Sequence, residues 1–201
     1  MHTITTRTLA IAAALTLGLT LAGCSTGNSG SDTGSSSSST SAASAASAHN
    51  DQDVMFAQMM LPHHKQAVEM SDMLLAKGSG VDTDVTTLAK QIKAEQSPEI
   101  KQLTSWLQGW GEPTESEHSG MGHSMSGMMS DSDMSDLDQA SAKDAAKLYL
   151  EQMVQHHKGA VDMAKTEVDK GKNTDAIAMA KSIVSSQTEQ ITQMQDMLAS
   201  L

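Results

Sequence analysis

The sequence MLPHHKQAVEMS at residues 60–71 returns almost unchanged as MVQHHKGAVDMA at residues 153–164. Seven of the twelve positions are identical, and the matched residues lie 93 positions apart. A second set of identities, 91 positions apart, pairs Gln96 with Gln187 and Leu107 with Leu198. Two similar segments in each half of the chain predict two copies of one helical hairpin.

The repeated segments have the spacing of helices with one apolar face. Phe56, Met60, His63, Ala67 and Met70 recur every three or four residues, and no stretch of useful length alternates as a strand would. Short connections within each hairpin make neighbouring helices antiparallel. The sequence therefore predicts an all-α fold, a four-helix bundle made of two repeated αα-hairpins.

Glycines and prolines predict interruptions in these helices. Gly78, Gly80 and Gly171 are expected to end helices in the left-handed conformation that glycine tolerates. Pro62 and Pro98 each remove one backbone donor, so we expect a kink or a helix restart at both.

Composition divides the chain into segments around this bundle. The bundle is assigned to residues 51–201, with a first hairpin at 51–112 and a second at 139–201. Residues 113–138 are rich in Gly, Ser, His, Met and Asp, which predicts a loop. Residues 24–50 are rich in Ser and Ala and lack large apolar side chains, which predicts a disordered tether.

The first residues have the pattern of a targeting segment. Arg7 precedes an apolar run, and the run ends in Leu-Ala-Gly-Cys at residues 21–24. This pattern predicts a secretory signal peptide at residues 1–23. Leu-Ala-Gly-Cys resembles the bacterial lipobox, which implies cleavage before Cys24 and lipidation of its thiol. We therefore expect a lipoprotein on the extracytoplasmic face of the cell membrane, periplasmic or extracellular.

Charge and cysteine content exclude several classes of protein. The formal net charge is -11, which argues against nucleic-acid binding because phosphate contacts need a basic face. A single Cys excludes an internal disulfide framework and an all-cysteine metal cluster. The 16 Met residues are far more than ordinary usage and suggest a role beyond packing.

The duplicated His-His pairs are the candidate metal ligands. Four imidazoles in a helical core would need more hydrogen-bond partners than an apolar interior supplies. Imidazole suits several transition metals, whereas thioether sulfur selects Cu(I), so the mixture points to copper. The candidate ligands on the helices are His63, His64, His156, His157, Met60, Met153, Met70 and Met163.

Other residues are candidates for supporting roles. The loop offers flexible donors for capture or hand-over: His118, His123, Met121 and Met125. Gln96 and Gln187 lie in apolar stripes, and we expect each to hydrogen-bond an imidazole and fix its tautomer. Because metal binding needs neutral imidazole, we expect affinity to fall as the pH drops through about 6.5.

The doubled motif, MLPHHKQAVEM at residues 60–70 and MVQHHKGAVDM at residues 153–163, resembles the bacterial family called domain of unknown function 305. The resemblance covers roughly residues 51–200. It implies a ferritin-like four-helix bundle, exported or lipid-anchored, and some members of the family are linked to copper binding and copper tolerance. Asp53 departs from the repeat, because its counterpart is Ala146, and we expect it to cap a helix.

The expected function is copper sequestration or delivery without catalysis, and the expected partners are the metal ion and the membrane. A homo-oligomer or a copper-exchange partner stays open. The alternative is a helical envelope module that binds a partner and no metal. A ferritin-like di-iron oxidase is disfavoured because neither His-His pair has Glu three residues earlier. A haem protein would need a pocket that the sequence does not indicate.

Overall fold

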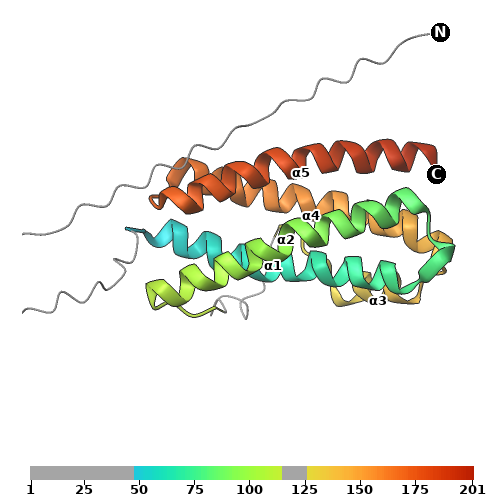
Figure 1. Cartoon of the computed structure of the whole chain (residues 1–201), viewed down its shortest axis with the longest axis horizontal. Coiled ribbons are helices and arrows are strands. Elements are labelled where there is room, and N and C mark those ends of the chain that lie inside the picture. The colour runs from blue at the N-terminus through green and yellow to red at the C-terminus, as the bar shows by residue number, and fades with distance from the viewer. Residues whose placement is uncertain (1–47, 115–125) are drawn as a thin grey trace, which may run out of the picture. The chain divides into compact units, whose positions relative to one another are not determined.

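The structure, a computed structural model, describes residues 48–114 and 126–201. These residues form helices and no strands, so the all-α prediction is confirmed. Cys24, the predicted signal peptide, and His118, Met121, His123 and Met125 lie outside the described residues. The elements are α1 (Asp51–Ala76), η1 (Gly78–Gly80), α2 (Thr83–Trp110), α3 (Asp131–Gln139), α4 (Ala142–Lys170) and α5 (Thr174–Ser200) (Figure 1).

The four long helices form two hairpins joined face to face. α1 packs along α2, α4 packs along α5, and α1 and α4 pack on each other. α3 is a short helix lying against α1 and α4 (Figure 1). This arrangement agrees with the predicted bundle of two repeated hairpins. None of the helices in the described part of the chain combines the length and apolar character that a bilayer crossing needs.

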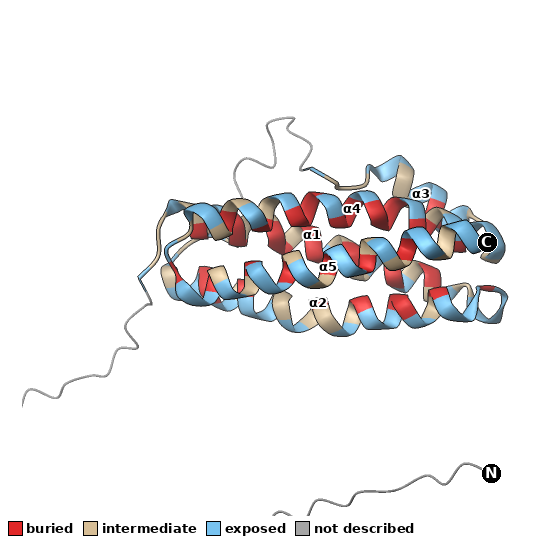
Figure 2. Ribbon diagram, turned by 90° about the horizontal axis from the view of Figure 1, so that it is seen from above, coloured by how far each residue is buried: buried red, intermediate tan, exposed pale blue. Residues whose placement is uncertain are grey.

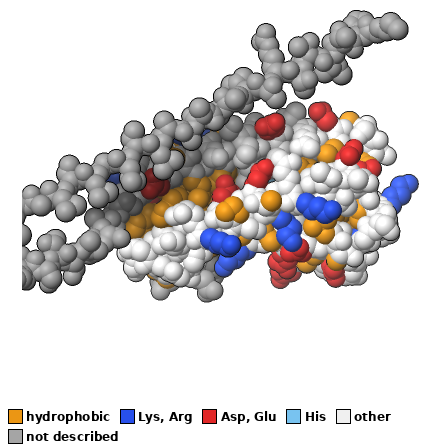
Figure 3. Space-filling view, in the orientation of Figure 1, with side chains coloured by type: hydrophobic (Ala, Val, Ile, Leu, Met, Phe, Trp, Pro, Cys, Tyr) orange, Lys and Arg blue, Asp and Glu red, His pale blue; other side chains and the backbone are white. Residues whose placement is uncertain are grey.

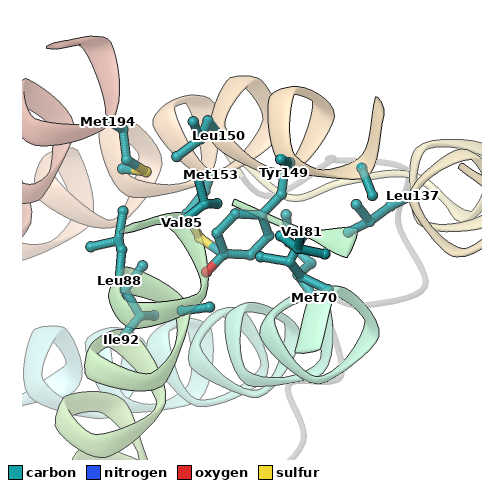
Figure 4. Packing of buried hydrophobic residues seen from close by; sticks show 14 of the residues in the cluster. Met70, Val81, Val85, Leu88, Ile92, Leu137, Tyr149, Leu150, Met153 and Met194 are labelled. Carbon is teal, nitrogen blue, oxygen red and sulfur yellow. The ribbon is translucent and has the colours of Figure 1, made fainter. Parts of the chain in front are cut away.

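The apolar core is divided into two clusters along the bundle. The tyrosine cluster contains Tyr149, Met70 and Met153 together with Leu88 and Ile92 (Figure 4). The tryptophan cluster, near the other end, is formed mainly by Phe56, Met60, Leu103, Trp106, Leu107, Ala160, Ala164 and Ile183. The tyrosine cluster contains residues from the late half of α1 and the early half of α4. The tryptophan cluster contains residues from the early half of α1 and the late half of α4. The helices α1 and α4 are therefore antiparallel. Buried residues line the facing sides of the helices (Figure 2).

Part of the predicted loop is helical, which corrects its boundary. α3 begins after Ser130, whose side chain accepts from the Asp133 amide while the Asp133 carboxylate accepts from the Ser130 amide. This capping box starts a helix despite the polar composition. Leu137 then anchors the helix, because its side chain is completely buried in the tyrosine cluster. Composition alone missed these two local signals.

The helix interruptions differ from expectation in part. Both α1 and α2 continue through their prolines, Pro62 and Pro98, without a restart, so of the two expected outcomes only a kink stays a prediction. Gly78 has a φ of 74° as expected, but Gly171 has a φ of -65° and is not left-handed. Gly171 is required for another reason, because a Cβ there would overlap the carboxyl group of Glu167.

The expected cap at Asp53 is instead a clamp between two parts of the bundle. Asn50, the last residue of the predicted tether, caps α1, and Asp53 completes its capping box. The Asp53 carboxylate also accepts hydrogen bonds from the backbone amides of Lys172 and Asn173, at 3.0 and 2.8 Å. Burial, with Asp53 beside it, raises the pKa of Glu167 to about 8. The start of α1 is therefore fixed to the turn between α4 and α5.

Candidate metal centre

The four paired histidines form one polar layer between the two apolar clusters. His63 and His64 come from α1, and His156 and His157 come from α4. All four side chains have an exposed fraction of 0%. We call these four residues the histidine layer. None of them belongs to either apolar cluster.

The first histidine of each pair meets its repeat equivalent. The ring centroids of His63 and His156 lie 3.7 Å apart, with an angle of 38° between the ring planes. His157 lies beside this pair, with its ring centroid 6.4 Å from that of His156. The predicted convergence of imidazoles from the two repeated segments is therefore present in the described structure.

Six ring nitrogens of this layer are buried and make no hydrogen bond of regular geometry with the described residues, although the Ser126 backbone lies near enough to His63, and the His63 backbone near enough to His156, to oppose the fall in their pKa values. They are Nδ1 and Nε2 of His63, Nδ1 and Nε2 of His156, Nδ1 of His64 and Nδ1 of His157. An unpaired buried polar group costs about 1–3 kcal/mol. Such a concentration of unpaired nitrogens does not serve packing, and it suits a group that accepts several nitrogen lone pairs at once.

The second histidine of each pair makes a hydrogen bond to a side chain of the neighbouring helix in its hairpin. His64 Nε2 lies 2.8 Å from Glu99 Oε2, on α2. His157 Nε2 lies 2.8 Å from Gln190 Oε1, on α5. The Gln190 amide nitrogen in turn donates to Glu95 Oε2 at 2.8 Å, which links α5 to α2. The imidazole partners are therefore Glu99 and Gln190.

The sequence had assigned this role to Gln96 and Gln187. Both are buried, but their side-chain oxygens have no hydrogen-bond partner in the described structure. No described hydrogen bond joins either residue to a histidine. The signal for the true partners was available, because Glu99 and Gln190 are also 91 positions apart, one turn beyond the identical glutamines. Glu99 and Gln190 differ in residue type, so identity between the repeats does not reveal the pair.

These partners fix which nitrogen carries the hydrogen. A carboxylate only accepts, so His64 Nε2 donates to Glu99. Gln190 turns its amide nitrogen toward Glu95, so its oxygen faces His157 and accepts from Nε2. In their neutral forms both histidines therefore present an unprotonated Nδ1, the arrangement in which a hydrogen-bonded imidazole orients a free nitrogen toward a metal.

Three rings of the layer have lowered pKa values. Burial lowers the pKa of His63 to about 3, and the imidazoles of His64 and His157 act in the same direction. Burial lowers the pKa of His157 to about 4, although its hydrogen bond to Gln190 opposes the shift. The pKa of His156 also lies well below its usual range because of burial and the neighbouring imidazoles. The loss of metal affinity expected near pH 6.5 stays a prediction, and the lowered pKa values of these three rings favour a loss at lower pH.

The helical methionines occupy two kinds of position. Met60 and Met153 are fully buried one turn before the histidines, Met60 in the tryptophan cluster and Met153 in the tyrosine cluster. They therefore flank the histidine layer from opposite sides. Met70 and Met163 lie two turns beyond, about 10 Å along each helix, and pack with the apolar clusters. The described structure does not bring these two to the imidazoles.

The layer is not a closed site formed by histidine and acidic residues alone. Among the described residues, no three His, Cys, Asp or Glu groups lie close enough together to hold one metal ion. The rings of His63 and His156 lie in contact, and Met60 and Met153 are buried one turn before them on the same helices. Low-coordinate binding by imidazole with soft sulfur suits Cu(I) better than a hard cation.

One backbone segment lies directly on the helices that carry the histidines. The Gln66 side chain exchanges two hydrogen bonds with the Met129 backbone, at 2.9 and 2.8 Å. On α4, Gly159 allows the Ser126 carbonyl to approach so closely that any Cβ would overlap it. Gln66 and Gly159 are repeat equivalents, 93 positions apart. We call residues 126–130 the strap, because both hairpins hold it.

Replacing Gly159 with Ala should release the strap. The new Cβ would overlap the Ser126 carbonyl, so the strap must move and its hydrogen bonds with Gln66 must lengthen. We expect faster hydrogen exchange at the Met129 amide, by at least tenfold, with unchanged exchange in the centre of α4. The control is Gly109→Ala, since that Cβ meets nothing within 4 Å. Unchanged Met129 exchange in the Gly159 variant would contradict the close approach.

Comparison with known families and structures gives a consistent result. The model of DUF305, a domain of unknown function, matches residues 53–198. No curated protein matches the chain. A DUF305 protein of Streptomyces coelicolor, provisionally named a secreted protein, is 35% identical with a TM-score of 0.69, covering 74% of this chain and 93% of that one. A DUF305 fragment from Deinococcus radiodurans is 30% identical with a TM-score of 0.69, covering 76% and 98%.

A third neighbour is a protein solved with metal. CopM in its Cu(I)-bound form is 27% identical to this chain with a TM-score of 0.62, and the match covers 74% of this chain and 96% of CopM. CopM has also been solved in a Cu(II)-bound form, which matches at 28% identity. The bundle described above is thus shared with a protein that binds copper in both oxidation states.

Proposed function

Since the chain belongs to the DUF305 family, whose structures include copper-bound CopM, we propose that it binds copper for sequestration or delivery outside the cytoplasm. The observation that carries the proposal is the histidine layer, with its six buried, unpaired ring nitrogens. His63 and His156 would provide the central donors. His64 and His157 would add their oriented Nδ1 atoms, and Met60 and Met153 would add sulfur.

The chemistry of the donor set supports copper over other metals. Neutral imidazole binds both copper ions, while thioether sulfur favours the reduced one. Carboxylates lie behind two of the imidazoles rather than among the candidate ligands, so the layer does not suit Mg²⁺ or Ca²⁺, which take oxygen ligands. The proposed activity is to bind and release the copper ion, and it includes no catalysed reaction.

The finer parts of the proposal concern location. We propose that the chain is a lipoprotein held at the extracytoplasmic face of the membrane through Cys24, as the Leu-Ala-Gly-Cys sequence predicts. The provisional name of the Streptomyces coelicolor neighbour supports export. The face drawn in Figure 3 carries acidic and basic side chains together with apolar areas, the widest of them toward the left. The net charge of -11 favours no direct contact with anionic lipid. His118, Met121, His123 and Met125 remain predicted capture ligands.

The test is copper titration of the full chain against a variant with His63, His64, His156 and His157 all replaced by Ala. We expect the parent to compete with a chromophoric chelator for Cu(I) and the variant to bind at least 100-fold more weakly. Far-ultraviolet circular dichroism checks that the variant keeps its helices. The control is His49→Ala, because His49 stacks on Trp110, outside the layer. Equal affinity in the quadruple variant would place the copper site elsewhere in the chain. No binding by the parent would instead favour the metal-free partner-binding module.

A further inference from the structure

The two halves of the histidine layer differ in charge although their sequences repeat. Glu99 and Gln190 occupy equivalent positions, and each contacts Nε2 of the second histidine in its hairpin at 2.8 Å. One is a carboxylate and the other is an amide. His64 therefore lies directly against a negative charge, whereas His157 does not.

The carboxylate nearest to His157 in the hydrogen-bond network, that of Glu95, is separated from the ring by the Gln190 amide. Gln190 donates to Glu95, so the carboxylate reaches His157 only through the amide. Glu95 has no acidic equivalent in the second hairpin, where Ser186 occupies the matching position. Among the described residues, the two carboxylates that hydrogen bonds link to the layer, Glu99 and Glu95, both come from α2. The Glu99 side chain is 21% exposed, so solvent screens its charge only in part.

We propose that Glu99 determines the preference of the layer between Cu(II) and Cu(I). The inference rests on the proposed function. When a carboxylate accepts a hydrogen bond from Nε2 of an imidazole, Nδ1 of the same ring becomes a stronger metal ligand. Its negative charge also stabilises a dipositive ion more than a monopositive one at the same position. Glu99 therefore raises affinity for Cu(II) more than affinity for Cu(I), and the first hairpin is the half of the layer that favours the oxidised ion.

Glu99→Gln tests this assignment directly, because the amide keeps the size and one acceptor while it removes the charge. We expect the ratio of Cu(II) affinity to Cu(I) affinity to fall about tenfold, the low end of what loss of an outer partner costs. Cu(II) is titrated directly and Cu(I) by chelator competition, with Ag(I) as a monopositive probe that does not change oxidation state. The matched control is Glu69→Gln, which removes one exposed carboxylate from α1.

A charge-conserving double variant tests the same idea in the opposite direction. Glu95→Gln with Gln190→Glu exchanges the amide and the carboxylate, so the hydrogen bond remains and the charge moves into contact with His157. We expect the ratio of Cu(II) to Cu(I) affinity to rise. A merely structural role would change both affinities equally in each variant.

The outcomes separate the two claims. If the parent binds both ions and Glu99→Gln gives the same ratio as Glu69→Gln, the role of Glu99 is wrong while the proposed function stands. If the ratio falls in Glu99→Gln and rises in the double variant, both claims are supported. If the parent binds neither ion, both are wrong.

Discussion

Replacing both His63 and His156 with Leu should raise the melting temperature of the copper-free protein and abolish its stabilisation by copper. These two rings hold four of the six buried nitrogens without a partner. Leucine is close to histidine in volume and leaves no polar atom unpaired. Because each unpaired group costs about 1–3 kcal/mol, we expect a gain of at least about 2 kcal/mol in the free energy of unfolding. For a domain of this size that is a rise of several degrees.

Differential scanning calorimetry with and without one equivalent of Cu(I) measures both effects. The matched control replaces the same residues with Ala, which removes the nitrogens but leaves a cavity and should lower the melting temperature. A fall in stability of the copper-free Leu variant would show that the imidazoles contribute to folding in their own right. Persistent stabilisation by copper would place the ion elsewhere.

The copper-free protein should also lose stability steeply as the pH falls from 6.5 toward 4. The pKa values of His63, His156 and His157 are lowered by burial, so the unfolded chain binds protons in this range that the folded protein cannot. Each such group changes the free energy of unfolding by about 1.4 kcal/mol per pH unit. Glu167 acts in the opposite direction, because its pKa is raised to about 8 and the folded protein retains that proton. The net loss is about 3 kcal/mol per pH unit near pH 5.5.

Urea unfolding at pH 6.5, 6.0, 5.5 and 5.0 measures this slope. In the variant with Leu at positions 63 and 156, only His157 remains to oppose Glu167, so the free energy of unfolding should be nearly independent of pH over this range. Equal slopes in parent and variant would rule out the histidine layer as the cause.

The sequence predicted most of the fold because the repeat and the apolar periodicity are both local signals. Residues 60–71 and 153–164 located the inner helices, and the 91-residue offset located the outer ones. α3 was missed because composition was weighed over a larger window than the capping box at Ser130 occupies. The expectation of a left-handed Gly171 is wrong because glycine is needed there to leave room for the Glu167 side chain, and not to adopt a positive φ.

The site was predictable in its histidines and not in their partners. His63 and His156 are identical in both repeats, so duplication itself indicated that they meet. Glu99 and Gln190 differ in chemistry. Only the packing of α2 on α1 and of α5 on α4 shows that each accepts a hydrogen bond from Nε2 of the second histidine in its hairpin. The lowered pKa values likewise follow from complete burial, which residue spacing does not establish.

The contact between His63 and His156 has a consequence for the origin of the chain. Equivalent atoms of two repeats touch only near an axis of approximate two-fold symmetry, so each hairpin supplies half of one centre. A hairpin on its own would expose its imidazoles to water and would have to dimerise to enclose them. Linking the two hairpins in one chain makes enclosure of the histidine layer independent of protein concentration.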